Sequence, residues 1–131
     1  MVISEKASNA FHSNLGDQSV YLQFCTLGWM MWNLAVSTLS NGATVVMYDG
    51  SPLAPTSLLW SFVDQYKITC LGISPRYLAV LAAEKYSPRK HHQLSSLSII
   101  ATTGSPLKEE LYDFIKHEVG VSSFHPTSLV Y

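Results

Sequence analysis

The sequence predicts an α/β fold: a parallel sheet of about four strands with helices on both faces. Strand-like and helix-like patterns alternate four times along the chain, and each change of period falls at Gly, Pro or Ser. The strand-like runs are also almost continuously apolar, which is typical of strands that are buried on both faces of a sheet. At 131 residues the chain has the length of one ordinary domain.

Four short apolar runs, rich in Val, Ile, Leu, Thr or Cys, are the predicted strands: residues 20–26, 43–48, 69–73 and 97–102. A segment with helical spacing follows each of them. The apolar positions of these segments are Trp29, Trp32, Val36 and Leu39; Leu59, Phe62, Val63 and Tyr66; Tyr77, Leu78, Leu81 and Ala82; and Leu107, Leu111, Phe114 and Ile115.

Two of the predicted helices have a marked beginning. Ser74-Pro75 and Ser105-Pro106 each place a capping side chain before a proline, and the first helical position is where proline costs no hydrogen bond. Residues 49–56 carry Gly50, Pro52 and Pro55 and are expected to form an irregular loop. Residues 120–131 show no pattern that predicts an element.

The carboxyl ends of the strands are the expected place for a ligand, because open parallel sheets bind ligands there. These ends are residues 27–29, 49–52, 74–75 and 102–106, and they should line one rim. Glycines in them allow close backbone approach, and Trp29, Met30, Met31 and Trp32 offer apolar walls. The composition suits a small-molecule site.

Charge and composition exclude several classes of partner. The net charge is −1 and the densest basic pair is Arg89-Lys90, which predicts no binding to nucleic acid. No apolar run approaches the roughly 18 residues that span a bilayer, so we expect no membrane segment and a cytoplasmic protein. Cys25 and Cys70 lie in apolar runs and are interpreted as core residues.

Charged residues make up only 13% of the chain, against about 25% in a typical soluble domain. A surface so poor in charge predicts that some faces are covered by other protein, and uncovered sheet edges give a route to self-association.

Other residues that could bind a metal or act in catalysis have simpler interpretations. His91-His92 lies among polar residues with no further ligand near it in sequence, which favours a solvated loop over a metal site. Asp49 follows a strand, but no GxGxxG motif accompanies it, and Ser105 is not in a GxSxG motif. We therefore assign no catalytic residue and no metal ligand within the chain.

Several strings together resemble one enzyme family. They are GWMMWN at residues 28–33, NGAT at 41–44, YDGSP at 48–52, LGIS at 71–74 and TTGSPL at 102–107. In order and spacing they are similar to the acetoacetyl-CoA synthetase family, within the adenylate-forming superfamily of acyl-CoA synthetases. The similarity covers roughly residues 8–119, and residues 120–131 diverge from it. The chain is thus expected to be part of an AMP-binding domain.

The resemblance implies a reaction and a set of ligands. Such enzymes use ATP and Mg²⁺ to join a carboxylic acid to AMP and then transfer the acyl group to coenzyme A. Here the acid would be acetoacetate or a similar short acid. By the resemblance, Gly104, Ser105 and Pro106 lie against the adenine of ATP, and Trp29, Met30 and Met31 lie beside the acyl and coenzyme A pocket.

The family's phosphate-binding loop, its magnesium-associated acid and its adenylation lysine have no counterpart in this sequence. Because these groups stabilise the transition state, we expect the chain alone to be inactive. The alternative is a non-catalytic α/β module that binds a protein partner or, weakly, a nucleotide.

Overall fold

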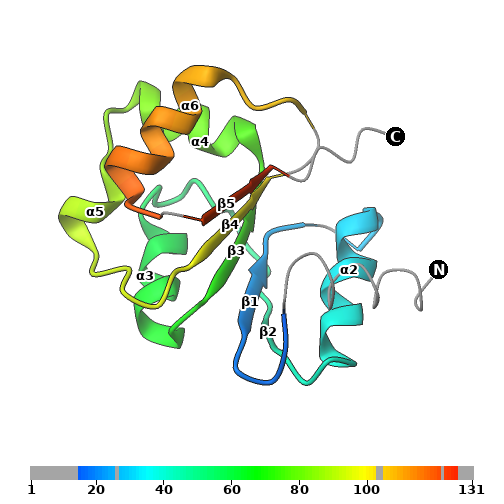
Figure 1. Ribbon diagram of the computed structural model, residues 1–131. Helices are drawn as coiled ribbons and strands as arrows, with labels where there is room; N and C mark the ends of the chain where they lie inside the picture. Colours follow the sequence, from blue (N-terminus) through cyan, green and yellow to red (C-terminus); the bar gives the residue numbers. More distant parts are fainter. Residues whose placement is uncertain (1–14, 26, 103–104, 122, 127–131) are drawn as a thin grey trace.

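The computed structural model describes residues 15–25, 27–102, 105–121 and 123–126. Its strands form one five-stranded sheet in the order β2-β1-β3-β4-β5, with every neighbouring pair parallel. They are β1 (Val20–Gln23), β2 (Thr44–Val46), β3 (Cys70–Ile73), β4 (Ile99–Thr102) and β5 (Ser123–Pro126). The predicted parallel α/β fold is confirmed, and the carboxyl ends of the strands lie at the same edge of the sheet (Figure 1).

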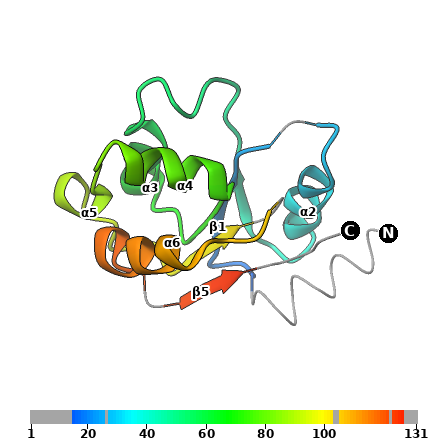
Figure 2. The same ribbon diagram turned by 90° about the horizontal axis from the view of Figure 1, so that it is seen from above.

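Helices cover both faces of the sheet, as predicted. They are α2 (Met30–Leu39), α3 (Leu58–Tyr66), α4 (Pro75–Ala83), α5 (Pro88–His91) and α6 (Glu109–Phe114), and α6 continues into a π-helical turn, η2 (Ile115–Val119). Seen from above, α2 lies on one side of the sheet, and α3, α4, α5 and α6 lie on the other (Figure 2).

The two faces of the sheet have separate cores because side chains alternate along each strand. On the side of α3, α4 and α6, the fully buried Leu22, Leu71 and Ile100 belong to the larger apolar cluster. On the side of α2, Tyr21 and Cys70 form a smaller cluster with Ala35. The helix α2 packs against the sheet through this second cluster.

The buried face of α2 differs from the predicted one. Val36 and Leu39 are 45% and 54% exposed, while Met31, Ala35 and Thr38 are buried. The helix is apolar nearly all round, so the spacing of its bulky residues could not show which side faces the sheet. Ala35 packs with Tyr21 and Cys70 beneath the helix, and Thr38 is fully buried, so small residues form its inner face.

One of the two predicted helix caps is correct. Ser74 Oγ accepts a hydrogen bond from the Tyr77 N–H at 3.2 Å, and Pro75 is the first residue of α4. The Ser105-Pro106 cap is wrong, because α6 begins at Glu109 after an extended Lys108. Leu107 packs against the core from the preceding non-helical segment, which delays the start of the helix.

The strand β5 lies in the part of the sequence that predicted no element. Gly120 ends η2 with φ of 84°, a conformation that favours glycine, and the chain then returns to pair with β4. Pro126 occupies the last position of this strand, opposite Thr102. A proline is tolerated there because β5 is one of the two edge strands of the described sheet, but a proline argues against a strand when the sequence alone is considered.

Candidate functional site

A groove of about 470 Å³ opens where the carboxyl ends of β1 and β2 meet α2. This volume is in the range of small-molecule sites. The lining is mainly apolar, with a few polar groups among aromatic and aliphatic walls: Gln23, Phe24, Cys25, Leu27, Trp32, Ala35, Val45, Val46, Met47, Tyr48, Asp49 and Gly50. The predicted rim is thus a concave surface at the ends of these two strands.

A smaller cavity of about 100 Å³ adjoins the groove and shares Phe24 with it. It lies between the loop that holds Pro52 and Leu53 and the start of α4 at Ser74. The Tyr77 hydroxyl donates a hydrogen bond to the Thr56 carbonyl oxygen at 2.8 Å, which fixes the loop over α4. Burial raises the pKa of Tyr77, so this hydroxyl stays a neutral donor.

Gln23 lines the groove and is held there by its own strand, β1, and by the neighbouring β3. The hydroxyl of the fully buried Tyr21 donates to Gln23 Oε1 at 2.6 Å. Gly72 lies opposite Gln23 in β3, and a Cβ there would collide with Gln23 Oε1. Burial raises the pKa of Tyr21 well above its usual value, so its proton remains available for this bond.

The two cysteines differ in their surroundings. Cys70 is buried under α2, and burial raises its pKa to about 12, so the core interpretation is confirmed for this residue. Cys25 is only partly buried and lines the groove, so the core interpretation is wrong for it. It follows β1 by two residues, where the strand has already ended and the chain turns across the rim.

The residues assigned by resemblance to adenine follow β4. Ser105 and Pro106 are exposed after the carboxyl end of that strand, and Gly104 lies outside the described residues. Those assigned to the acyl and coenzyme A pocket lie at the start of α2. Trp29 precedes the helix and is 61% exposed, Met30 is the first residue of the helix, and Met31 is buried.

The sequence reading missed Gln23 and Tyr48, which also belong to the groove. Gln23 is the one amide in the apolar run 20–26, and a polar side chain near the carboxyl end of a buried strand could have marked it. Tyr48 gave no such signal, because an aromatic residue at a strand end is as common in a core as in a site.

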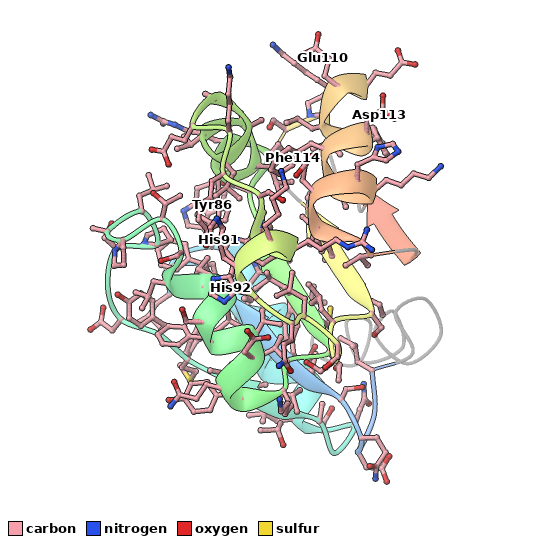
Figure 3. All side chains as sticks on the ribbon, turned by 90° about the vertical axis from the view of Figure 1, so that its left-hand side faces the viewer. Tyr86, His91, His92, Glu110, Asp113 and Phe114 are labelled. Atoms are coloured by element: carbon pink, nitrogen blue, oxygen red, sulfur yellow. The ribbon has the colours of Figure 1, made fainter. Side chains whose placement is uncertain are left out.

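A second group of polar side chains lies between α3, α4 and α5, and its residues do not line the groove. His92 Nδ1 is 3.3 Å from Asp64 Oδ2, and His92 Nε2 is 3.0 Å from the Tyr86 hydroxyl. His91 stacks on Tyr86 with ring centroids 5.2 Å apart, and Figure 3 shows these three side chains together. With His92 only 12% exposed, the solvated-loop interpretation is wrong for it.

Asp64 is the centre of this group. Its carboxylate accepts backbone hydrogen bonds from Leu94 at 2.9 Å and Gln93 at 3.2 Å. Partial burial works to raise its pKa, but these two bonds and the contact with His92 outweigh burial and lower it. The group therefore fastens the segment after α5 to α3, which is a structural role.

Two further findings bear on ligands and location. Within the described ranges, no three His, Cys, Asp or Glu side chains come together in a way that could hold a metal ion. In the same ranges no helix is both long and apolar enough to cross a membrane.

Comparison with known proteins places these features in a family. Residues 2–127 match the AMP-binding enzymes. Acetoacetyl-CoA synthetase of Gallus gallus is 41% identical over 118 residues, covering 88% of this chain and 18% of the relative. Malonamoyl-CoA synthetase vrtB of Penicillium aethiopicum is 36% identical over 120 residues, covering 80% of this chain and 16% of the relative.

The fold gives the same result. The solved structure of acetoacetyl-CoA synthetase from Streptomyces lividans superposes with a TM-score of 0.85 at 31% identity, covering 91% of this chain and 19% of that one. The chain spans less than a fifth of the length of these relatives. A parallel sheet with a groove at its carboxyl edge and a family match over nearly its whole length show that the chain belongs to the family of AMP-binding enzymes.

Proposed function

We propose that this chain forms part of the acid- and nucleotide-binding surface of an acetoacetyl-CoA synthetase-like ligase. Such a ligase would use ATP to activate a short acid and coenzyme A to receive it. The observation that carries the proposal is the apolar groove at the ends of β1 and β2, in a chain similar to acetoacetyl-CoA synthetases. The carboxyl edge of a parallel sheet is also where ligands of such folds bind.

The groove suits the carbon chain of a short acid. Phe24, Trp32 and Val45 give it apolar walls, and Gln23 gives it a polar group in a fixed orientation. Walls of this kind select an acid by shape and exclude water from its carbon chain. Trp29, Met30 and Met31, at the start of α2, would border the acyl and coenzyme A pocket.

The nucleotide would lie beyond the end of β4. ATP, when bound, supplies the AMP that activates the carboxylate. Gly104, Ser105 and Pro106 are proposed to lie against its adenine, and the exposure of Ser105 and Pro106 leaves their surface free for this contact. The described residues offer no cluster that fits Mg²⁺, so we assign it no ligand among them.

The isolated chain is proposed to be inactive. Among the described residues that line the groove and the adjoining cavity, Arg76 carries the one cationic group. Adenylate formation needs several positive charges around the phosphates. With ATP, Mg²⁺, acetoacetate and coenzyme A present, we expect no release of pyrophosphate above background, and a measurable turnover would contradict this part of the proposal.

Protection of Cys25 tests whether the groove is the site. A non-hydrolysable acetoacetyl-adenylate analogue in the groove should slow alkylation of the partly exposed Cys25 thiol, as measured by mass spectrometry of the labelled peptide. We expect protection only at analogue concentrations above micromolar, because the described lining of the groove and the adjoining cavity has one cationic group, Arg76, to hold the phosphate. Equal labelling of Cys25 at saturating and zero analogue would show that the acid lies elsewhere.

A further inference from the structure

We propose that Gln23 is a specificity-determining residue, which donates a hydrogen bond to the carbonyl oxygen on carbon 3 of the acid. This inference rests on the proposed function and names the feature of the acid that the groove would select. It follows from the orientation of one amide, from the donor which that orientation leaves unused, and from the acceptor which an activated acid still has.

Two contacts fix the orientation of the Gln23 amide. Tyr21 Oη donates to Gln23 Oε1 at 2.6 Å, and Gln23 Nε2 lies 3.5 Å from the Phe24 carbonyl oxygen. Turning the amide over would place Oε1 against that carbonyl, an unfavourable pairing of two acceptors. The carbonyl therefore selects the orientation in which Nε2 is the donor beside Phe24 and Oε1 accepts from Tyr21, since the hydroxyl alone could pair with either end of the amide.

The side chain is also confined in space. Its Oε1 occupies the room that the missing side chain of Gly72 leaves above β3. Tyr21 is buried beneath α2 with Cys70 and Ala35, so its hydroxyl cannot move to another partner without disturbing that cluster. The amide is thus positioned before any ligand arrives, as a selective site requires.

One hydrogen of the amide remains unused. A glutamine amide has two N–H donors, and within the described part of the chain Nε2 makes a single contact, the long one with Phe24. Gln23 lines a groove whose walls are mainly apolar, and we assign the second donor to that space. A donor in such surroundings discriminates strongly between ligands that carry an acceptor and ligands that do not.

The activated acid offers one acceptor at that place. In the proposed function the carboxylate of the acid is joined to AMP, so it is committed to the nucleotide. The groups named in two relatives, acetoacetyl and malonamoyl, share a second carbonyl on carbon 3. Gln23 would read this carbonyl, while Trp32 and Val45 enclose the carbon chain beside it.

The test compares two acids of four carbons, acetoacetate and butyrate, which differ in the carbonyl on carbon 3. Titrations of the ¹⁵N-labelled chain, followed by amide spectra, give a dissociation constant for each acid. We expect acetoacetate to bind roughly three- to ten-fold tighter, the effect of one hydrogen bond. The side-chain amide signal of Gln23 should shift with acetoacetate and stay in place with butyrate.

Two variants isolate the donor. Gln23→Leu removes the amide at similar size, and Gln23→Glu keeps an acceptor for Tyr21 Oη but loses the donor. Both should reduce the preference for acetoacetate to about one, by the loss of that same bond. Gln18→Leu is the matched control, since Gln18 is exposed before the opposite end of β1, and it should keep the wild-type preference.

The outcomes separate this inference from the proposed function. If both acids shift the signals of the groove but Gln23→Leu and Gln23→Glu keep the preference, the role of Gln23 is wrong and the groove remains the site. The same holds if the Gln23 amide signal of the wild-type chain responds equally to both acids. If neither acid perturbs the groove at any concentration, the inference and the proposed function both fail.

Discussion

Two thiols of similar sequence surroundings are expected to react very differently. Burial raises the pKa of Cys70 to about 12, so at pH 8 only about one molecule in ten thousand carries its thiolate. Burial also raises the pKa of Cys25, but this thiol is partly exposed at the groove. Iodoacetamide at pH 8 should therefore label Cys25 in the folded chain and label Cys70 only after denaturation, as peptide mass spectrometry would show.

Faster labelling with rising pH is part of the same prediction. Because the pKa of Cys25 lies above its usual value, its labelling rate should still be climbing at pH 9. A rate that has already levelled off at pH 8, or labelling of Cys70 in the native chain, would contradict the surroundings described for these residues.

Asp64 should make stability depend on acid pH. Hydrogen bonds from Leu94, Gln93 and His92 lower its pKa in the folded chain. The carboxylate therefore contributes stability that is fully present above its unfolded pKa of about 4 and is lost as the pH falls through the lower, folded value. Asp64→Ala should lower the free energy of unfolding by about 1–2 kcal/mol at pH 7, measured by urea denaturation.

The matched control is Asp113→Ala, on the exposed side of α6. It should change the free energy of unfolding by less than about 0.5 kcal/mol, both at pH 7 and below pH 4. The difference between wild type and Asp64→Ala should shrink below pH 4. A difference that stays constant down to pH 2 would show that the carboxylate charge has no part in holding Gln93 and Leu94.

At the scale of elements, the two Ser-Pro pairs give a direct comparison. Ser74 caps α4 through a hydrogen bond to the Tyr77 N–H, whereas α6 begins three residues beyond Pro106. Ser74→Ala should therefore lower the free energy of unfolding by about 1 kcal/mol. Ser105→Ala should leave it within about 0.5 kcal/mol of wild type, because Ser105 is exposed and caps no described helix.

Urea denaturation of both variants measures this pair of effects. An equal loss in the two variants would mean that Ser105 also caps a helix in solution, and the start of α6 would then have to be moved to Pro106.

Elements could be predicted from the sequence wherever one physical cause dominated. The strands β1 to β4 followed from continuous apolar runs, and α4 followed from its cap and its buried Tyr77, Leu78 and Leu81. Two features were hidden. The inner face of α2 depends on the small Ala35 and Thr38, and β5 depends on pairing with β4 across the turn at Gly120. Both are set by tertiary contacts, which leave no periodic pattern of apolar residues in the local sequence.

The candidate site was predictable in position but not in composition. The carboxyl edge follows from topology alone, once the strands are parallel. Which side chains share the groove depends on how far each strand extends past its last pairing. Gln23 reaches the groove because Tyr21 and Gly72 hold it there, and these residues come together only when β1 pairs with β3.

For the whole molecule, the outer face of α2 is the surface we expect to drive self-association. Trp29, Val36 and Leu39 are exposed on it, and the sequence has no Asp, Glu, Lys or Arg between Asp17 and Asp49. An uncharged, apolar surface of this kind favours contact with other protein. Sedimentation should show the chain forming dimers or larger species as its concentration rises.

Charges on that face should oppose association. The double variant Val36→Lys, Leu39→Lys should remain monomeric at concentrations where the wild type does not, while its fold is kept because both side chains are exposed. Tyr66→Lys places one lysine at an exposed position of α3, on the other side of the sheet, and should associate like the wild type. A monomeric wild-type chain at high concentration would contradict this use of the surface.

We expect the acid and its nucleotide to bind at the carboxyl edge of the parallel sheet. The most direct measurement is a residue-by-residue map of amide shifts in the ¹⁵N-labelled chain as a non-hydrolysable acetoacetyl-adenylate analogue is added. Binding there should shift the signals of Cys25, Asp49 and Ser74, and none at the amino edge around Gly16 and Gly42. Shifts confined to the amino edge, or spread evenly over both edges, would contradict it.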